Sequence, residues 1–328
     1  MAKSLTRVAI LLMVFWGAAT GAADADTKHA PLRQAELLAL VAGNALPENI
    51  VREIGTDGLA FHPDDAYRSL LSVADADPTV LKALDSAKVI FTDGVEDRAS
   101  KELLQHISDA GKLIKSKHYD EAAKQLTEAV TDSFKNPECA FVMGELLRQQ
   151  EDWERAEVVY EAVLSEDPDF PEAHTKLSYI LYRTGDGEES LREAKSALAL
   201  TQDNAEAHKN AGLALATMRK FDAAIVEYRE ALRLKPDYWA VHMDLGLMYA
   251  DKGAWDDSIV EYRKAIALDA SEADAFYNMG YAYDQKGDFE SAIREYAEAR
   301  PSRARERSTP PSQSSSKPSH STRNRFRS

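Results

Sequence analysis

The feature that most constrains the fold of this chain is an internal repeat with a period of 34 residues, which runs over residues 103–299. Six consecutive windows carry a small side chain at their eighth position, namely Ala110, Gly144, Ser178, Gly212, Gly246 and Gly280. Their eleventh position is instead large and apolar: Leu113, Leu147, Leu181, Leu215, Tyr249 and Tyr283. A fixed period of roughly 20–50 residues indicates a chain built from stacked copies of one supersecondary unit.

Each copy is predicted to contain two helices. In the fourth window, apolar residues recur at intervals of three and four residues over 205–216 and again over 223–234, which is the periodicity of an amphipathic helix. Small side chains let two such helices approach closely, and large ones fill the space between them. The pattern therefore predicts an all-α fold made of antiparallel helix pairs.

At these positions the sequence resembles the tetratricopeptide repeat family, and in particular its exported bacterial members. The resemblance implies a right-handed α-solenoid of about six helix–turn–helix units. The units span 103–136, 137–170, 171–204, 205–238, 239–272 and 273–299. Ala194 stands where the family has a large aromatic residue, so we expect the third unit to pack less tightly.

Two stretches flank the repeats. Residues 24–102 contain short runs of helical periodicity separated by Gly and Pro, and they predict a small helical N-terminal domain. Residues 300–328 hold eight Lys or Arg and nine Ser, which predicts a disordered basic tail. The tail is either an electrostatic tether to an anionic surface or to nucleic acid, or the product of a truncated or shifted reading frame.

The chain begins with the features of a secretory signal peptide. Lys3 and Arg7 precede an apolar stretch at residues 8–16, and small residues follow as far as Ala23, the usual order in a cleavable signal. The apolar stretch is too short for a transmembrane helix, which needs about 20 residues. We therefore expect 1–23 to be removed and the mature protein to be periplasmic or secreted, without stable membrane insertion. The alternative is an N-terminal anchor in the inner membrane.

The charge and the motif content exclude several classes of protein. A net charge of −15 argues against nucleic acid as a partner, because phosphate binding is driven by Lys and Arg. The sequence holds no phosphate-binding glycine loop, no H-E-x-x-H zinc motif and no G-x-S-x-G nucleophile motif. It therefore predicts no enzyme and no cofactor.

Four histidines occupy the fourth position of their units: His106, His174, His208 and His242. Equivalent positions on stacked helices lie at least roughly 8–10 Å apart, whereas zinc ligands lie about 2 Å from the metal. We therefore predict no shared metal site and expect these histidines to be partly buried packing residues.

In the resembled family, the first helix of each unit lines a concave groove that binds a peptide or a partner protein. The matching residues here are Phe141, Arg148, Tyr179, Tyr182, Lys209, Asn210, Met243, Tyr277, Asn278 and Tyr281. Tyrosines offer a large contact area at low entropic cost, and the alternative for about half of them is helix packing. The resemblance implies a non-catalytic interaction scaffold in the cell envelope. The alternative is a substrate-recruiting subunit of an envelope enzyme or assembly complex.

Overall fold

The structure is a computed structural model that describes residues 30–91, 97, 99–130, 137–271 and 273–299. These residues form sixteen helices and two isolated bridges, Leu32–Leu59 and Leu59–Val89, which confirms the all-α prediction. Among the described helices, none combines the length and the apolar character needed to cross a bilayer. The predicted signal peptide and the predicted tail lie outside the described residues.

Four short helices precede the repeats: α1 (Gln34–Ala42), α2 (Pro47–Thr56), α3 (Asp65–Val73) and α4 (Pro78–Ala83). α2 and α4 each begin with a proline. At this position a backbone N–H would have no partner inside the helix, so the N–H that proline lacks is not missed. In α1, every residue from Leu37 to Ala42 is buried. A helix that is apolar on all sides has to be surrounded by other elements.

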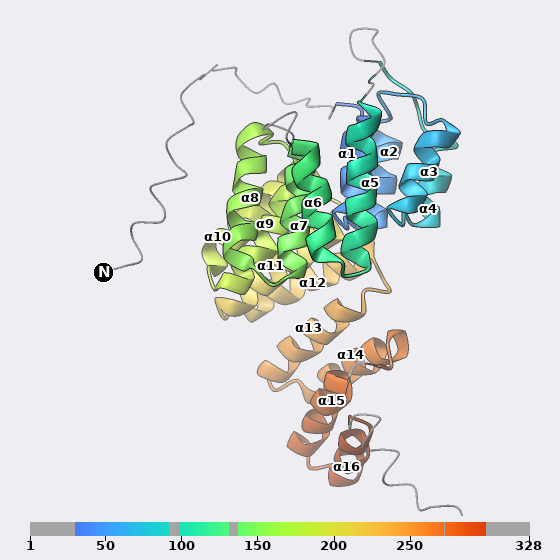
Figure 1. Cartoon of the computed structure of the whole chain (residues 1–328). Helices are drawn as coiled ribbons and strands as arrows, with labels where there is room; N and C mark the ends of the chain where they lie inside the picture. Colours follow the sequence, from blue (N-terminus) through green and yellow to red (C-terminus); the bar gives the residue numbers. More distant parts are fainter. Residues whose placement is uncertain (1–29, 92–96, 98, 131–136, 272, 300–328) are drawn as a thin grey trace, which may run out of the picture.

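Six helix pairs follow, and we call the first member of each pair the A helix and the second the B helix. The pairs are α5 (Lys101–Lys115) with α6 (Tyr119–Val130), α7 (Pro137–Gln149) with α8 (Trp153–Glu166), α9 (Pro171–Thr184) with α10 (Gly187–Leu200), α11 (Ala205–Thr217) with α12 (Phe221–Leu234), α13 (Trp239–Asp251) with α14 (Trp255–Leu268), and α15 (Ala273–Gln285) with α16 (Phe289–Glu298). They follow one another from the green to the red end of the chain in Figure 1.

The small residue at the eighth position of a unit lets the two helices of that unit approach. Gly144 lies against the ring of Tyr160, and Gly212 lies against the ring of Tyr228. The third unit has no such ring, and the expectation that it packs loosely is wrong. There the Ser178 hydroxyl donates to the Ser190 carbonyl and the Ser190 hydroxyl to the Ser178 carbonyl, both at 2.8 Å, so two hydrogen bonds join the helices.

Successive pairs stack through their A helices. α9 packs against α11, α11 against α13, and α13 against α15, while α8, α10, α12 and α14 each pack against the A helix that follows. Because neighbouring A helices contact one another, they lie on the inner side of the curve. This arrangement is the α-solenoid that the sequence predicts.

The N-terminal helices pack against the first repeats. α1 lies against α5 and α7, and α3 lies against α5, as the blue end of the chain shows in Figure 1. Gly43, which ends α1, lies so close to the Phe141 ring that a β-carbon would overlap it. One buried apolar cluster therefore runs from α1 to α9.

Candidate functional site

All ten predicted groove residues lie on α7, α9, α11, α13 and α15, whose common surface we call the A-helix face. A cavity of about 240 Å³ opens on this face beside the turn that joins α1 to α2, residues 44–47. The side chains around it are those of Arg148, Lys176, Tyr179, Glu206, Lys209 and Tyr238. Three predicted groove residues, Arg148, Tyr179 and Lys209, thus meet at one place.

Cationic side chains lie over aromatic rings at this cavity and next to it. The Nζ atom of Lys209 lies 5.3 Å from the ring centroid of Tyr179 and 5.5 Å from that of Tyr238. The Arg183 guanidinium lies 4.2 Å from the ring centroid of Trp153. A cation within about 6 Å of a ring face is attracted to it, so the rings hold both cations on the A-helix face.

The other cations at the cavity are paired with carboxylates. Arg148 donates two hydrogen bonds of 2.7 Å to the Glu145 carboxylate. The Nζ atom of Lys176 donates to the Asn44 carbonyl at 3.0 Å and lies 3.2 Å from both carboxylate oxygens of Glu206. Burial acts to raise the pKa of Glu206, but the charges of Lys176, Lys209 and Arg148 and the hydrogen bond from Lys176 together outweigh it, and the pKa is lowered. A buried ion pair thus joins α9, α11 and the α1–α2 turn.

Two predicted groove residues lie in the interior instead. Phe141 is buried against Gly43, and its ring centroid lies 4.9 Å from that of Phe170. Asn210 is also buried, and its Nδ2 atom donates to the Thr175 carbonyl at 2.9 Å. These two side chains join neighbouring elements and do not line an open surface in this structure.

The A-helix face is open in the last unit. Tyr277 and Tyr281 of α15 are 56% and 44% exposed, and their spacing of four residues places them on one side of the helix. The Tyr281 ring centroid lies 6.1 Å from that of Trp255. Met243 and Asn278 are partly buried. Tyr182 belongs to the cavity group, since its ring centroid lies 6.1 Å from that of Tyr179.

α2 reaches the A-helix side of the array through charged side chains. Glu48 pairs with Lys235, which follows α12, and Arg52 donates to the Asp203 carbonyl just before α11. These contacts join residues more than 100 positions apart in the sequence. The N-terminal segment therefore covers part of the A-helix face between α9 and α11.

Two buried carboxyl groups interact across the contact of α2 with α9. The side chains of Glu53 and Glu172 are both buried, and each carboxyl group shifts the pKa of the other. Burial, and next the charge of Glu172, raises the pKa of Glu53 well above its usual range. Burial also raises the pKa of Glu172, and it raises the pKa of Glu36 on α1 to about 7. The docked segment therefore favours protonated carboxyl groups.

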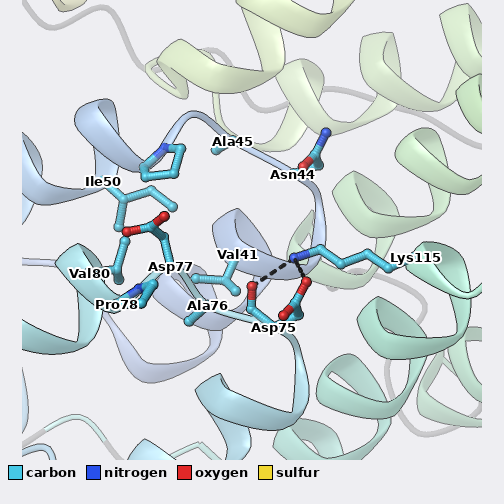
Figure 2. A pocket seen from close by; sticks show the side chains of 11 residues that line it. Val41, Asn44, Ala45, Ile50, Asp75, Ala76, Asp77, Pro78, Val80 and Lys115 are labelled. Carbon is cyan, nitrogen blue, oxygen red and sulfur yellow. Dashed lines mark hydrogen bonds and ion pairs between the residues drawn. The ribbon is translucent and has the colours of Figure 1, made fainter. Parts of the chain in front are cut away.

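A second cavity, of about 300 Å³, lies among the N-terminal helices. Figure 2 shows apolar side chains such as Val41, Ile50 and Val80 on one side of it and Lys115 on the other. The Nζ atom of Lys115 donates to the Asp75 carbonyl at 2.8 Å and lies 3.4 Å from the Asp75 carboxylate. None of the predicted groove residues lines this cavity, and its lysine is already paired.

The four histidines join the A helix of a unit to its own B helix. In each case Nδ1 contacts the residue 19 positions later: His106 with Gln125 at 2.8 Å, His174 with Glu193 at 2.6 Å, His208 with Glu227 at 2.7 Å and His242 with Glu261 at 2.7 Å. Burial acts to lower the pKa of His174 and of His208, but the hydrogen bond to the glutamate, the hydrogen bond to a backbone carbonyl and the nearby acidic charges together outweigh it, and both pKa values are raised. Within the described residues, no group of His, Cys, Asp and Glu has the arrangement of a metal site.

Sequence reasoning missed several residues of the cavity. Tyr238, which lines the cavity, directly precedes α13, so an aromatic residue at the last position of its unit was an available signal. Lys176 and the turn at 44–47 gave no such signal, because their role depends on where α1 docks.

Comparison with known proteins places the repeats in context. The family model described as TPR repeat matches residues 220–253 and 246–287, and the one described as Tetratricopeptide repeat matches 147–211. PilW, a widely conserved type IV pilus biogenesis factor, is 19% identical and has a TM-score of 0.57, with 61% of this chain and 92% of that chain covered. For pilF of Pseudomonas aeruginosa the values are 14% identity, a TM-score of 0.53, and 60% and 89% coverage. For MamA they are 28% identity, a TM-score of 0.43, and 48% and 91% coverage. No curated protein matches the chain.

Proposed function

This chain belongs to the tetratricopeptide repeat family, and on that premise we propose that it is a non-catalytic scaffold that binds a partner protein or peptide on its A-helix face. The chain acts by binding alone, in the periplasm or outside the cell, after removal of residues 1–23. The partner lies along α9, α11, α13 and α15.

The observation that carries this proposal is the exposure of Tyr277 and Tyr281 on α15. Large amphipathic side chains that stay accessible on one side of a helix are typical of protein-binding surfaces. Tyr179, Tyr182 and Lys209 add a second group on the same face, beside the cavity. The two groups suit a segment with mixed apolar and polar side chains, since Lys209 offers a cation and the tyrosines offer both rings and hydroxyl groups.

The docked N-terminal segment limits where such a partner binds. Phe141 is covered by the end of α1, and the α1–α2 turn contacts Lys176 of α9, which also pairs with Glu206 of α11. The open part of the A-helix face therefore begins at Tyr179 and Lys209 and continues toward α15. Of the ten residues predicted from the sequence, we retain eight as candidates and leave out Phe141 and Asn210, which are buried.

A photo-crosslinking experiment in intact cells tests this proposal. A photoreactive amino acid replaces Tyr281, and in a control chain it replaces Val158, which is equally exposed but lies on the B helix α8. We expect a discrete adduct at position 281 and none at position 158, and the change Tyr281→Ala should weaken capture by about 1–2 kcal/mol. An adduct with an enzyme that co-purifies stably would favour the recruiting-subunit alternative. Equal adducts at both positions would contradict a partner site on the A-helix face.

A further inference from the structure

The outer face of the last helix pair is apolar, and no other part of the described chain covers it. On α16, Phe289 and Ile293 are exposed, Ile293 to 71%. The equivalent isoleucines of the two preceding B helices, Ile225 and Ile259, are only 5% and 4% exposed. The side chain is the same in all three units, so the difference in its exposed fraction comes from the element that packs on it.

The internal units show what kind of element covers this face. Ile225 of α12 shares a buried cluster with Val241, Leu245 and Met248 of the following A helix, α13. Ile259 of α14 shares one with Met279 of the following A helix, α15. The residues that α13 contributes are spaced by four and three positions, which places them on one side of that helix. The covering element in each case is thus an amphipathic helix.

The segment that directly follows α16 does not supply a seventh such helix. Residues 300–328 contain one aliphatic side chain, Ala304, and one aromatic, Phe326, among eight basic residues and nine serines. Such a segment has no apolar stripe to place against Ile293.

A second copy stacked head to tail cannot supply the helix either. The first A helix of the array, α5, is already covered by α1 and α3. The contact is close, since the Ser108 hydroxyl donates to the Leu70 carbonyl at 2.8 Å and Gly111 lies against Ala42. The two ends of the array therefore differ, because one is capped by the chain's own helices and the other ends in an open apolar face.

We infer that the outer face of α15 and α16 is a second interaction surface, which docks an amphipathic helix of a partner protein. That helix carries apolar side chains at positions i, i+4 and i+7, as Val241, Leu245 and Met248 of α13 do. It packs on Ile293 and Tyr296 in the way that α13 packs on Ile225 and Tyr228. This surface adjoins the A-helix face at Tyr277, whose ring centroid lies 5.3 Å from that of Tyr296.

A peptide binding experiment tests this inference. The probe is a fluorescently labelled, acetylated and amidated peptide with the sequence of residues 239–253, added to the whole chain and followed by fluorescence anisotropy. A free peptide of this length must form its helix on binding, so the change in affinity between variants is the readout. We expect Ile293→Glu to weaken binding at least tenfold. The control Val226→Glu, at a 62% exposed position of α12, should leave binding unchanged, and so should deletion of residues 300–328 from the otherwise unaltered chain.

Three results would overturn the inference. Equal binding by the wild-type chain and the Ile293→Glu variant would show that the peptide does not use this face. A peptide affinity that rises at least tenfold on deletion of residues 300–328 would identify the tail as the natural occupant. A dimer in sedimentation equilibrium that Ile293→Glu dissociates would identify a second copy as the occupant. Because Ile293 is exposed, the glutamate variant should fold, and circular dichroism checks this directly.

Discussion

The ring of Tyr262 lies directly against Gly246, so that a β-carbon on the glycine would stand 2.6 Å from ring carbon Cε1. Tyr262 is buried and belongs to the cluster that joins α14 to α15. The glycine therefore affects two contacts. It leaves room for the Tyr262 ring between α13 and α14, and the same ring packs in the cluster between α14 and α15. Packed interiors leave little room to accommodate an added methyl group.

Replacing Gly246 by Ala should lower the free energy of unfolding by about 1–3 kcal/mol through overpacking. Alanine otherwise favours a helix over glycine by about 1 kcal/mol, so the loss would come from the contact with Tyr262. Urea unfolding followed by circular dichroism measures the effect. The matched control is Gly55→Ala in α2, where a β-carbon meets nothing within 4 Å and should leave stability equal or higher. A Gly246→Ala chain as stable as wild type would contradict the close contact.

The buried carboxyl groups of Glu53 and Glu172 should make the stability of the N-terminal half pH-dependent. Their pKa values are raised in the folded chain, so the folded state binds more protons than the unfolded one. The contribution of these groups to the free energy of unfolding is fully present below the unfolded pKa of about 4.3, and it is lost as the pH rises toward the folded pKa values. Each group loses about 1.4 kcal/mol for each pH unit that separates its folded pKa from its unfolded pKa. Glu53→Gln should reduce this fall between pH 5 and pH 8 in denaturant unfolding, whereas Glu48→Gln on the exposed side of α2 should preserve it.

The histidine contacts offer a site-specific titration. Glu227→Gln removes the charge beside His208, so the raised pKa of His208 should drop, while the pKa of His174 stays in place. Glu193→Gln should have the reverse effect, which makes each variant the control for the other. Proton NMR of the imidazole C2–H resonances measures both pKa values. A histidine whose pKa is raised on folding stabilises the folded state most below its unfolded pKa of about 6.5. This contribution is lost as the pH rises through the folded pKa. Movement of both histidines in either variant would argue against separate contacts.

Export should leave a mature chain that begins between Asp24 and Asp26. The apolar stretch at 8–16 is too short to span a bilayer, and Ala23 provides a small residue before the cleavage point. N-terminal sequencing of the protein recovered from a periplasmic extract checks this. Arg7→Glu reduces the positive charge before the apolar stretch and should lower export without changing the fold of the remaining chain. Material that starts at Met1 or Ala2 in the extract would show that the segment is retained.

The repeat period was sufficient to predict the solenoid because contacts in such an array are local. Gly212 and Tyr228 lie 16 positions apart in the same unit, and the same spacing recurs along the sequence. The expectation drawn from Ala194 is wrong, because two serine hydroxyls replace the expected ring by bonding to opposite backbone carbonyls. The acidic partners of the histidines also repeat every 34 residues, so the period contained that signal as well.

The site was less predictable because it depends on contacts that do not repeat. Nothing in the period of the array indicates that α1 docks on α7 or that the turn at 44–47 borders a cavity beside Lys209. One local signal did exist: α1 is apolar on every side, and such a helix needs neighbours all round. Which neighbours it finds follows from complementary shapes at Gly43 and Phe141, which a single sequence does not reveal.

The docking of α1 also has a consequence for synthesis on the ribosome. α1 leaves the exit tunnel before α5 and α7, against which it packs, and α7 ends about 100 residues later at Gln149. At a translation rate of roughly 5–20 residues per second, α7 is complete on the order of ten seconds after α1, and the apolar surface of α1 stays uncovered by α7 during this time. Arrays with local contacts fold as they emerge, whereas a non-local contact of this kind slows the first units and exposes them to aggregation. A chaperone that holds α1 during this interval would thus matter more for this chain than for an array that starts directly at its first repeat.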